Sequence, residues 1–163
     1  TSQIKVTGLE HIRINDSVII LTSNSVSIDS ISNESNSILK KKELSYSKTK
    51  ISKKENCIVS VKVTNSGKVK SDEVVQLYVS DLVASVVVPN FQLTNMKRIT
   101  LEPGETKEVI FDLTPKAFEM VKNDGSRVVE SGDFKIYVGG SSPMKRSFEL
   151  GAPKMAELIV TVK

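Results

Sequence analysis

Apolar and polar residues alternate in five segments of the chain, which is the pattern of half-buried β-strands. The apolar positions are Val59, Val61 and Val63; Val75, Leu77 and Val79; Val109, Phe111 and Leu113; Phe134, Ile136 and Val138; and Leu158, Val160 and Val162. Residues that favour turns separate these segments, including Asn65-Ser66-Gly67, Pro103-Gly104 and Gly139-Gly140. The pattern predicts an all-β fold in which two sheets pack face to face around one core.

The chain after Leu113 breaks this alternation. Thr114 is suited to cap a helix, Pro115 suits the first helical position, and the turn residues that follow would end the helix. We predict one or two helical turns across an end of the sandwich. Phe118 and either Met120 or Val121 would then fill that end of the core.

The first 40 residues have a different character from the rest. Period-two pairs predict short strands at Ile4 and Val6, Ile12 and Ile14, Val18 and Ile20, and Val26 and Ile28. Serine and asparagine become frequent over residues 22–37, which weakens the later strands. We place a boundary near residues 38–42. Residues 1–40 are then a β-rich extension or the remnant of a neighbouring domain, and residues 41–163 are the sandwich.

The amino-acid composition of the chain argues against some classes of binding partner. The 163 residues carry a formal net charge of +4, and the only basic cluster, Lys40-Lys41-Lys42, is interpreted as a solvated linker. No apolar run approaches the roughly 20 residues of a transmembrane helix. Three Tyr, five Phe and no Trp leave few rings for stacking on nucleic acid bases. We therefore expect neither a nucleic acid nor a membrane as a partner.

Cys57 is the only cysteine, and its place in an alternating segment predicts a buried, unreactive side chain. It can form no internal disulfide, so the sequence is compatible with a cytoplasmic or a secreted location. The chain starts at Thr1 with no charged-then-apolar leader. We interpret it as a piece of a longer polypeptide in which no signal peptide is visible.

No constellation of residues predicts catalysis. His11 is the only histidine and lacks a nucleophile elbow or oxyanion glycines, so we interpret it as an ordinary strand residue. The carboxylate pairs Glu102 with Glu105 and Glu130 with Asp133 flank turns and are interpreted as solubilising charges. One His and one Cys do not make a zinc site, and no spaced Asp loop indicates calcium. The sequence predicts no catalytic residue, no metal and no cofactor.

One connection is long for a hairpin and carries an apolar run. Its members are Val86, Val87, Val88, Pro89 and Phe91. Such a run is rarely exposed without a reason. Two hypotheses remain open at this point. The loop either packs back on its own sandwich or docks on another domain.

Several segments resemble, in the same order, one known β-module. They are residues 61–67, 72–81, 91–99, 101–107, 129–134 and 138–142. Together they resemble the fibronectin type III-like domain of glycoside hydrolase family 3, the β-glucosidase and β-xylosidase group. The resemblance covers about residues 43–142 and does not extend to the first 40 residues.

This resemblance implies an immunoglobulin/fibronectin III-like sandwich that is an accessory to catalysis. In the family, the nucleophilic Asp and the acid/base Glu belong to other domains, and the loop that matches residues 86–91 lies against those domains. The implied partners are the catalytic domains of the same polypeptide, which would hydrolyse β-glucosides or β-xylosides. The alternative is a free-standing carbohydrate-binding or adhesion module, with polysaccharide as its partner.

Overall fold

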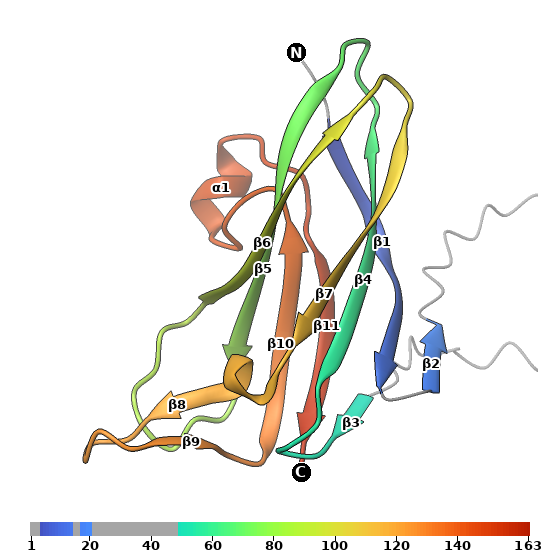
Figure 1. Cartoon of the computed structure of the whole chain (residues 1–163). Coiled ribbons are helices and arrows are strands. Elements are labelled where there is room, and N and C mark those ends of the chain that lie inside the picture. The colour runs from blue at the N-terminus through green and yellow to red at the C-terminus, as the bar shows by residue number, and fades with distance from the viewer. Residues whose placement is uncertain (1–3, 15–16, 21–48) are drawn as a thin grey trace, which may run out of the picture.

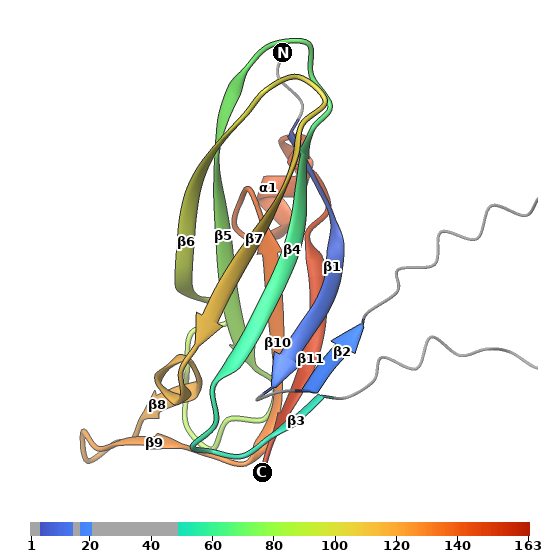
Figure 2. The same ribbon diagram turned by 45° about the vertical axis from the view of Figure 1, so that its right-hand side comes forward.

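A computed structural model describes residues 4–14, 17–20 and 49–163 of the chain. Two sheets pack face to face, and both views show them as two layers of long strands (Figures 1 and 2). The first sheet has the order β2 (Ser17–Ile20), β1 (Ile4–Ile14), β4 (Cys57–Asn65) and β7 (Thr106–Leu113). The second has the order β3 (Thr49–Ile51), β11 (Ala156–Val162), β10 (Gly132–Gly139), β5 (Ser71–Asp81) and β6 (Gln92–Leu101).

The five alternating segments of the sequence are the strands β4, β5, β7, β10 and β11, so the prediction of an all-β sandwich is confirmed. Neighbouring strands run antiparallel, except that β3 lies parallel to β11. The apolar positions of these strands are buried and form one core between the sheets. Because each strand turns alternate side chains inward, the core contains no buried side-chain nitrogen or oxygen without a hydrogen-bond partner among the described residues.

The predicted helical turn is a 3₁₀ helix, η1 (Pro115–Phe118), which leads into the strand β8 (Glu119–Val121). β8 pairs with β9 (Arg127–Val129) as a separate two-stranded hairpin. Phe118 is buried and meets Phe134 edge to face, with ring centroids 5.2 Å apart. Of the two alternatives for the next core residue, Met120 is buried and Val121 is exposed. The reason is that the chain is already extended after η1, so successive side chains alternate.

The N-terminal strand β1 pairs antiparallel with β4 and adds to the first sheet. The pairs Ile4/Val6 and Ile12/Ile14, predicted as separate strands, belong to this one strand, whose register shifts twice between Val6 and His11. β2 contains Val18 and Ile20 as predicted. The pair Val26/Ile28 and the boundary near residues 38–42 lie outside the described residues. The division of the chain at residue 40 therefore stays a prediction.

The short helix α1 (Lys145–Glu149) was not predicted from the sequence. It lies in the connection from β10 to β11, and Figure 1 shows it standing off the sheets. None of its own residues is buried. Buried Pro143 and Met155 hold the connection at either end. Five residues are too few to reveal a helical period, which is why the pattern alone did not indicate α1.

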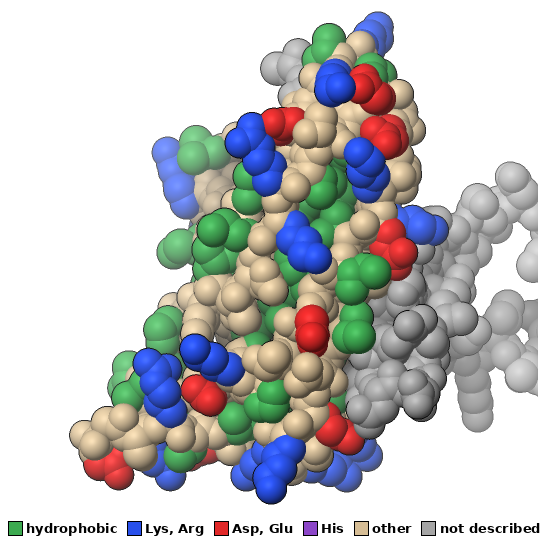
Figure 3. Space-filling view, viewed as in Figure 1, with side chains coloured by type: hydrophobic (Ala, Val, Ile, Leu, Met, Phe, Trp, Pro, Cys, Tyr) green, Lys and Arg blue, Asp and Glu red, His purple; other side chains and the backbone are tan. Residues whose placement is uncertain are grey.

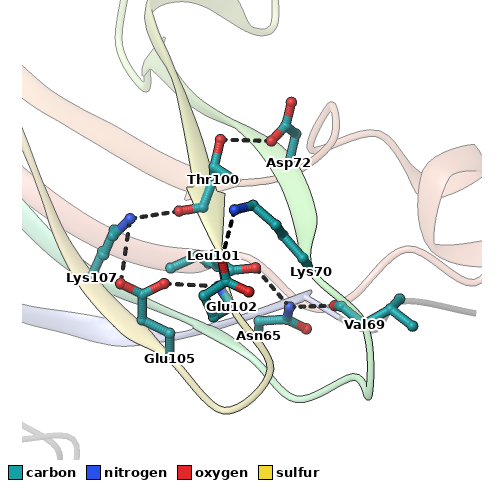
Figure 4. Close-up of polar contacts among 9 residues, drawn as sticks. All are labelled: Asn65, Val69, Lys70, Asp72, Thr100, Leu101, Glu102, Glu105 and Lys107. Atoms are coloured by element: carbon teal, nitrogen blue, oxygen red, sulfur yellow. Dashed lines mark hydrogen bonds and ion pairs between the residues drawn. The ribbon is translucent and has the colours of Figure 1, made fainter.

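The two sheets are joined by Asn65 at the end of β4 (Figure 4). Its buried side-chain amide donates to the carbonyl of Val69 at 2.9 Å and to that of Leu101, in the other sheet, at 3.1 Å. Its side-chain oxygen accepts from the Gly67 N–H at 2.9 Å, and its carbonyl accepts from the Gly104 N–H at 2.8 Å. One side chain therefore connects both turns at this end of the sandwich.

Candidate docking surface

The connection from β5 to β6 spans residues 82–91 and has no regular secondary structure. Three polar contacts hold it to the sandwich. The Leu82 N–H donates to the Asp133 carbonyl at 3.0 Å, the Val83 N–H donates to the Asp81 carboxylate at 3.0 Å, and the Ser85 hydroxyl donates to Glu130 at 2.7 Å. The loop is thereby placed at the end of the sandwich opposite to the Asn65 joint (Figure 1).

The loop and the η1–β8–β9 segment enclose a cavity of about 380 Å³. The loop lines it with Val87, Val88 and Pro89, and the sandwich contributes Phe118 and Met120 among others. Of the five residues predicted for docking, these three line the cavity. Charged side chains stand only in part of its wall, where Asp81, Glu119 and Arg127 occur together. The cavity is therefore suited to an apolar group more than to an ion.

The remaining two predicted residues behave differently. Phe91 is half-buried and packs edge to face on Tyr137, with ring centroids 5.4 Å apart, so it belongs to its own sandwich. Val86 is half-buried without lining the cavity. In contrast, Val87 has a relative exposure of 102%. Part of the loop therefore packs on its own sandwich, Val87 is exposed, and docking on another domain stays a prediction.

Other large apolar side chains are exposed around Val87. Leu82 and Val83 belong to the same loop, and Val121 belongs to the adjacent hairpin. We call Leu82, Val83, Val87 and Val121, together with the cavity, the loop surface. The space-filling view shows hydrophobic side chains along the side that carries α1 above and this loop below (Figure 3).

The second wall of the cavity was not found from the sequence. The β8–β9 hairpin supplies it, and its turn contains Asn123-Asp124-Gly125, with Gly125 at φ 83°. An Asn-Asp-Gly turn between short apolar pairs is a recognised hairpin signal. In the sequence, the Thr-Pro pair before this turn favours a helix that ends there, and this helix signal masks the hairpin signal.

The structure describes the side chains of Cys57, Glu102 and Glu130, three of the candidate groups considered from the sequence. Burial, with a smaller contribution from the Asp112 carboxylate, raises the pKa of the Cys57 thiol to about 12, so the reactive thiolate is suppressed. Glu102 pairs with Lys70 at 2.6 Å, and Glu130 accepts from Ser85, so these carboxylates serve turns and loops. Within residues 4–14, 17–20 and 49–163, no cluster of His, Cys, Asp and Glu could hold a metal ion.

The same described part of the chain contains no helix with the length and apolar character needed to span a bilayer. Its longest regular segments are strands, and α1 has only five residues.

Comparisons with known proteins identify the module. Residues 73–142, from β5 to just beyond β10, match the family model of the fibronectin type III-like domain. The chain is 50% identical over 94 residues to a beta-xylosidase of Formosa agariphila, covering 58% of this chain and 13% of that protein. It is 41% identical over 101 residues to thermostable beta-glucosidase B of Acetivibrio thermocellus, covering 61% of this chain and 13% of that protein.

A solved structure shows the same fold. The crystal structure of a beta-glucosidase from Listeria innocua superposes with a TM-score of 0.62 and 28% identity, covering 71% of this chain and 14% of that protein. The resemblance to the accessory module of family 3 glycoside hydrolases is confirmed. The chain spans about one seventh of the length of these relatives.

Proposed function

Because the chain carries a fibronectin type III-like domain of the kind found in family 3 β-glucosidases and β-xylosidases, we propose that it is the accessory domain of such a hydrolase. In this proposal the longer polypeptide cleaves β-glucosides or β-xylosides in its other domains. The sandwich supplies no reacting group. It docks the loop surface on the catalytic domains and stabilises their arrangement, which helps to keep the substrate cleft in shape.

The observation that carries the proposal is the position of Val87. Its side chain is fully exposed and lines a cavity with both apolar and charged walls, while the loop on either side is held to the sandwich. A valine held in water gains nothing, whereas transfer of such a side chain into an apolar contact contributes about 1.5 kcal/mol or more. The position is therefore suited to an apolar contact with a neighbouring domain.

The test is Val87→Asp in the full-length polypeptide. A carboxylate placed in an apolar contact loses its hydration without gaining a partner, so docking should weaken by about 2 kcal/mol or more. Thermal unfolding of the full-length protein should begin at a lower temperature. Hydrogen exchange should show faster exchange in the loop and in the catalytic-domain segment that had covered it.

Val69→Asp is the matched control. Val69 is also an exposed valine, with 58% relative exposure, but lies in the β4–β5 turn at the opposite end of the sandwich. We expect its effect to stay within about 0.5 kcal/mol, as for most surface substitutions. Equal unfolding temperatures for the two variants would show that the loop surface faces solvent in the full-length protein.

A further inference from the structure

The outward side of β5 carries two large side chains with apolar surface, Val74 and Tyr78, among the polar residues Asp72, Gln76 and Ser80. Val75, Leu77 and Val79 are buried in the core, so the alternate residues point away from it. Those residues include Val74, which is exposed, and Tyr78, which is half-buried. The Tyr78 hydroxyl donates to the Gln76 side chain at 2.6 Å, in agreement with a shared outward face.

The strand register places further apolar side chains of the neighbouring strands close to Val74 and Tyr78. Leu93 of β6 and Tyr137 of β10 both lie directly opposite Tyr78. Met96 lies opposite Gln76, one step diagonally from Val74, and directly opposed and diagonal neighbours in a sheet are close enough to touch. Met96 has a relative exposure of 61%. We call Val74, Tyr78, Leu93, Met96 and Tyr137 the outer-sheet patch.

The outer-sheet patch is continuous with the loop surface. Gln92 lines the cavity and is followed directly by Leu93 of the patch, and Phe91, at the end of the loop, packs edge to face on Tyr137 of the patch. One covering body could therefore contact the loop and the sheet together.

The charged side chains that border the patch are compensated within the sheet. Arg98, two residues after Met96 along β6 and directly opposite Val74, forms an ion pair with Asp72. Lys135 forms an ion pair with Glu157 at 2.7 Å and stands over the Tyr137 ring, 5.0 Å from its centroid. Each of these four charged groups therefore has a partner of opposite charge. The border of the patch gives no electrostatic attraction for a nucleic acid or an anionic lipid surface.

We infer that the outer-sheet patch is a second docking face, covered by an uncharged apolar surface on the remainder of the same polypeptide. The inference rests on the proposed function. Two observations favour this occupant: the related hydrolases are about seven times longer than the matched segment, which leaves ample chain to cover the patch, and the patch continues the loop surface. The sandwich then contacts its neighbour along its five-stranded sheet as well as at one end.

Met96 provides a direct test in the unaltered full-length polypeptide. Mild peroxide or hydroxyl radicals convert exposed methionine to the sulfoxide, and mass spectrometry follows the rate at each site. If the patch is covered, Met96 should oxidise about tenfold or more slowly in the native protein than in urea. With 61% exposure in the sandwich itself, an uncovered Met96 should oxidise within about twofold of its rate in urea, and this result would overturn the inference.

Two further measurements identify the occupant. Protection that appears only as the protein dimerises with concentration would assign the patch to a second copy, and protection that requires added xylan or glucan would assign it to polysaccharide. Either result would overturn the inference. Protection that is independent of both supports it.

A pair of variants separates this inference from the proposed function. Met96→Glu should lower the unfolding temperature of the full-length protein by about 5 °C or more, because it buries a carboxylate at the contact. Ile110→Glu, at an exposed site of 46% on the other sheet, should leave it unchanged. If Met96→Glu is silent while Val87→Asp is damaging, the proposed function stands and this inference fails. If both are silent, the proposed function fails.

Discussion

The two outer faces of the sandwich differ in chemistry although both belong to sheets that cover the same core. On the first sheet, β4 and β7 present Lys62 opposite Glu108, and Thr64 and Thr106 share a hydrogen bond of 2.7 Å. Ile110 is the only large apolar side chain described as exposed on these two strands. On the second sheet, the outward positions of β5, β6 and β10 carry the outer-sheet patch beside the ion pairs Arg98–Asp72 and Lys135–Glu157. The inward faces are apolar in both.

The first sheet has the outer face that is better suited to contact with water. Polar cross-strand pairs such as Thr64 with Thr106 satisfy one another and remain hydrated at little cost. Exposed Met96 and Leu93 gain only when something else covers them. Outward residues do not contribute to the core, so the contrast is in keeping with the proposed second docking face.

The largest effect is expected at Asn65, which joins the two sheets. Asn65→Ala leaves the carbonyls of Val69 and Leu101 and the Gly67 N–H without their buried partner. We expect a loss of about 2–3 kcal/mol in the free energy of unfolding, measured by urea denaturation. Asn56→Ala, at an exposed asparagine, should cost less than about 0.5 kcal/mol. Equal costs would show that the sheets are held by their core alone.

A smaller effect is expected at Phe91, where the loop contacts the outer-sheet patch. Phe91→Ala removes the edge-to-face contact with Tyr137 and should cost about 1 kcal/mol, with faster hydrogen exchange over residues 82–91. Phe148→Ala is the matched control, because Phe148 lies on α1, is 40% exposed and makes no ring contact with a described residue. An unchanged exchange rate in the loop of the Phe91 variant would separate the loop from the sheet.

The smallest effects concern two adjacent carboxylates at the start of β5, and they should have opposite signs. Hydrogen bonds from the Thr100 hydroxyl and the Arg98 guanidinium lower the pKa of Asp72 below its usual 3.8. Its ionised form therefore stabilises the fold above pH 3.8, and this contribution is lost as the pH falls through the folded-state pKa. Asp72→Asn should destabilise the protein near pH 7 and have little effect near pH 2.

Glu73 behaves in the other direction, because partial burial beside Gly140 raises its pKa above the usual 4.5. The fold favours its neutral form, so no cost exists below pH 4.5, and a cost develops as the pH rises through the folded-state pKa. Glu73→Gln should therefore stabilise the protein near neutral pH and lose this advantage below pH 4.5. Urea denaturation across the pH range measures both variants. The same sign for both at neutral pH would contradict the assigned environments.

The alternation of apolar and polar residues predicts most of the fold, because the side that a residue faces depends on its position within its own strand. Val61 and Leu77 are recognisable as inward residues without knowledge of their partners, and both are fully buried. The same reasoning left Met120 and Val121 as alternatives, because the position at which η1 gives way to β8 decides which of the two faces the core. It also missed α1, whose few residues contribute nothing to the core.

The sequence shows the candidate loop as an apolar run. The run alone does not show which of its residues are exposed and which pack on the sandwich. Val87 and Phe91 are similarly apolar, yet one projects into solvent and the other rests on Tyr137. The cavity beside Val87 needs a wall from the β8–β9 hairpin, which lies about 30 residues further along the chain.

The sequence alone is enough to predict the strands β4, β5, β7, β10 and β11 with their inward faces, because these depend on period and local backbone preference. Which strands become neighbours follows from how the sheets assemble. That assembly placed Tyr78 between Leu93 and Tyr137 and joined β4 to β6 through Asn65. Register is a property of pairs of strands distant in sequence, so an outer face with one chemical character exists only after the sheets have formed.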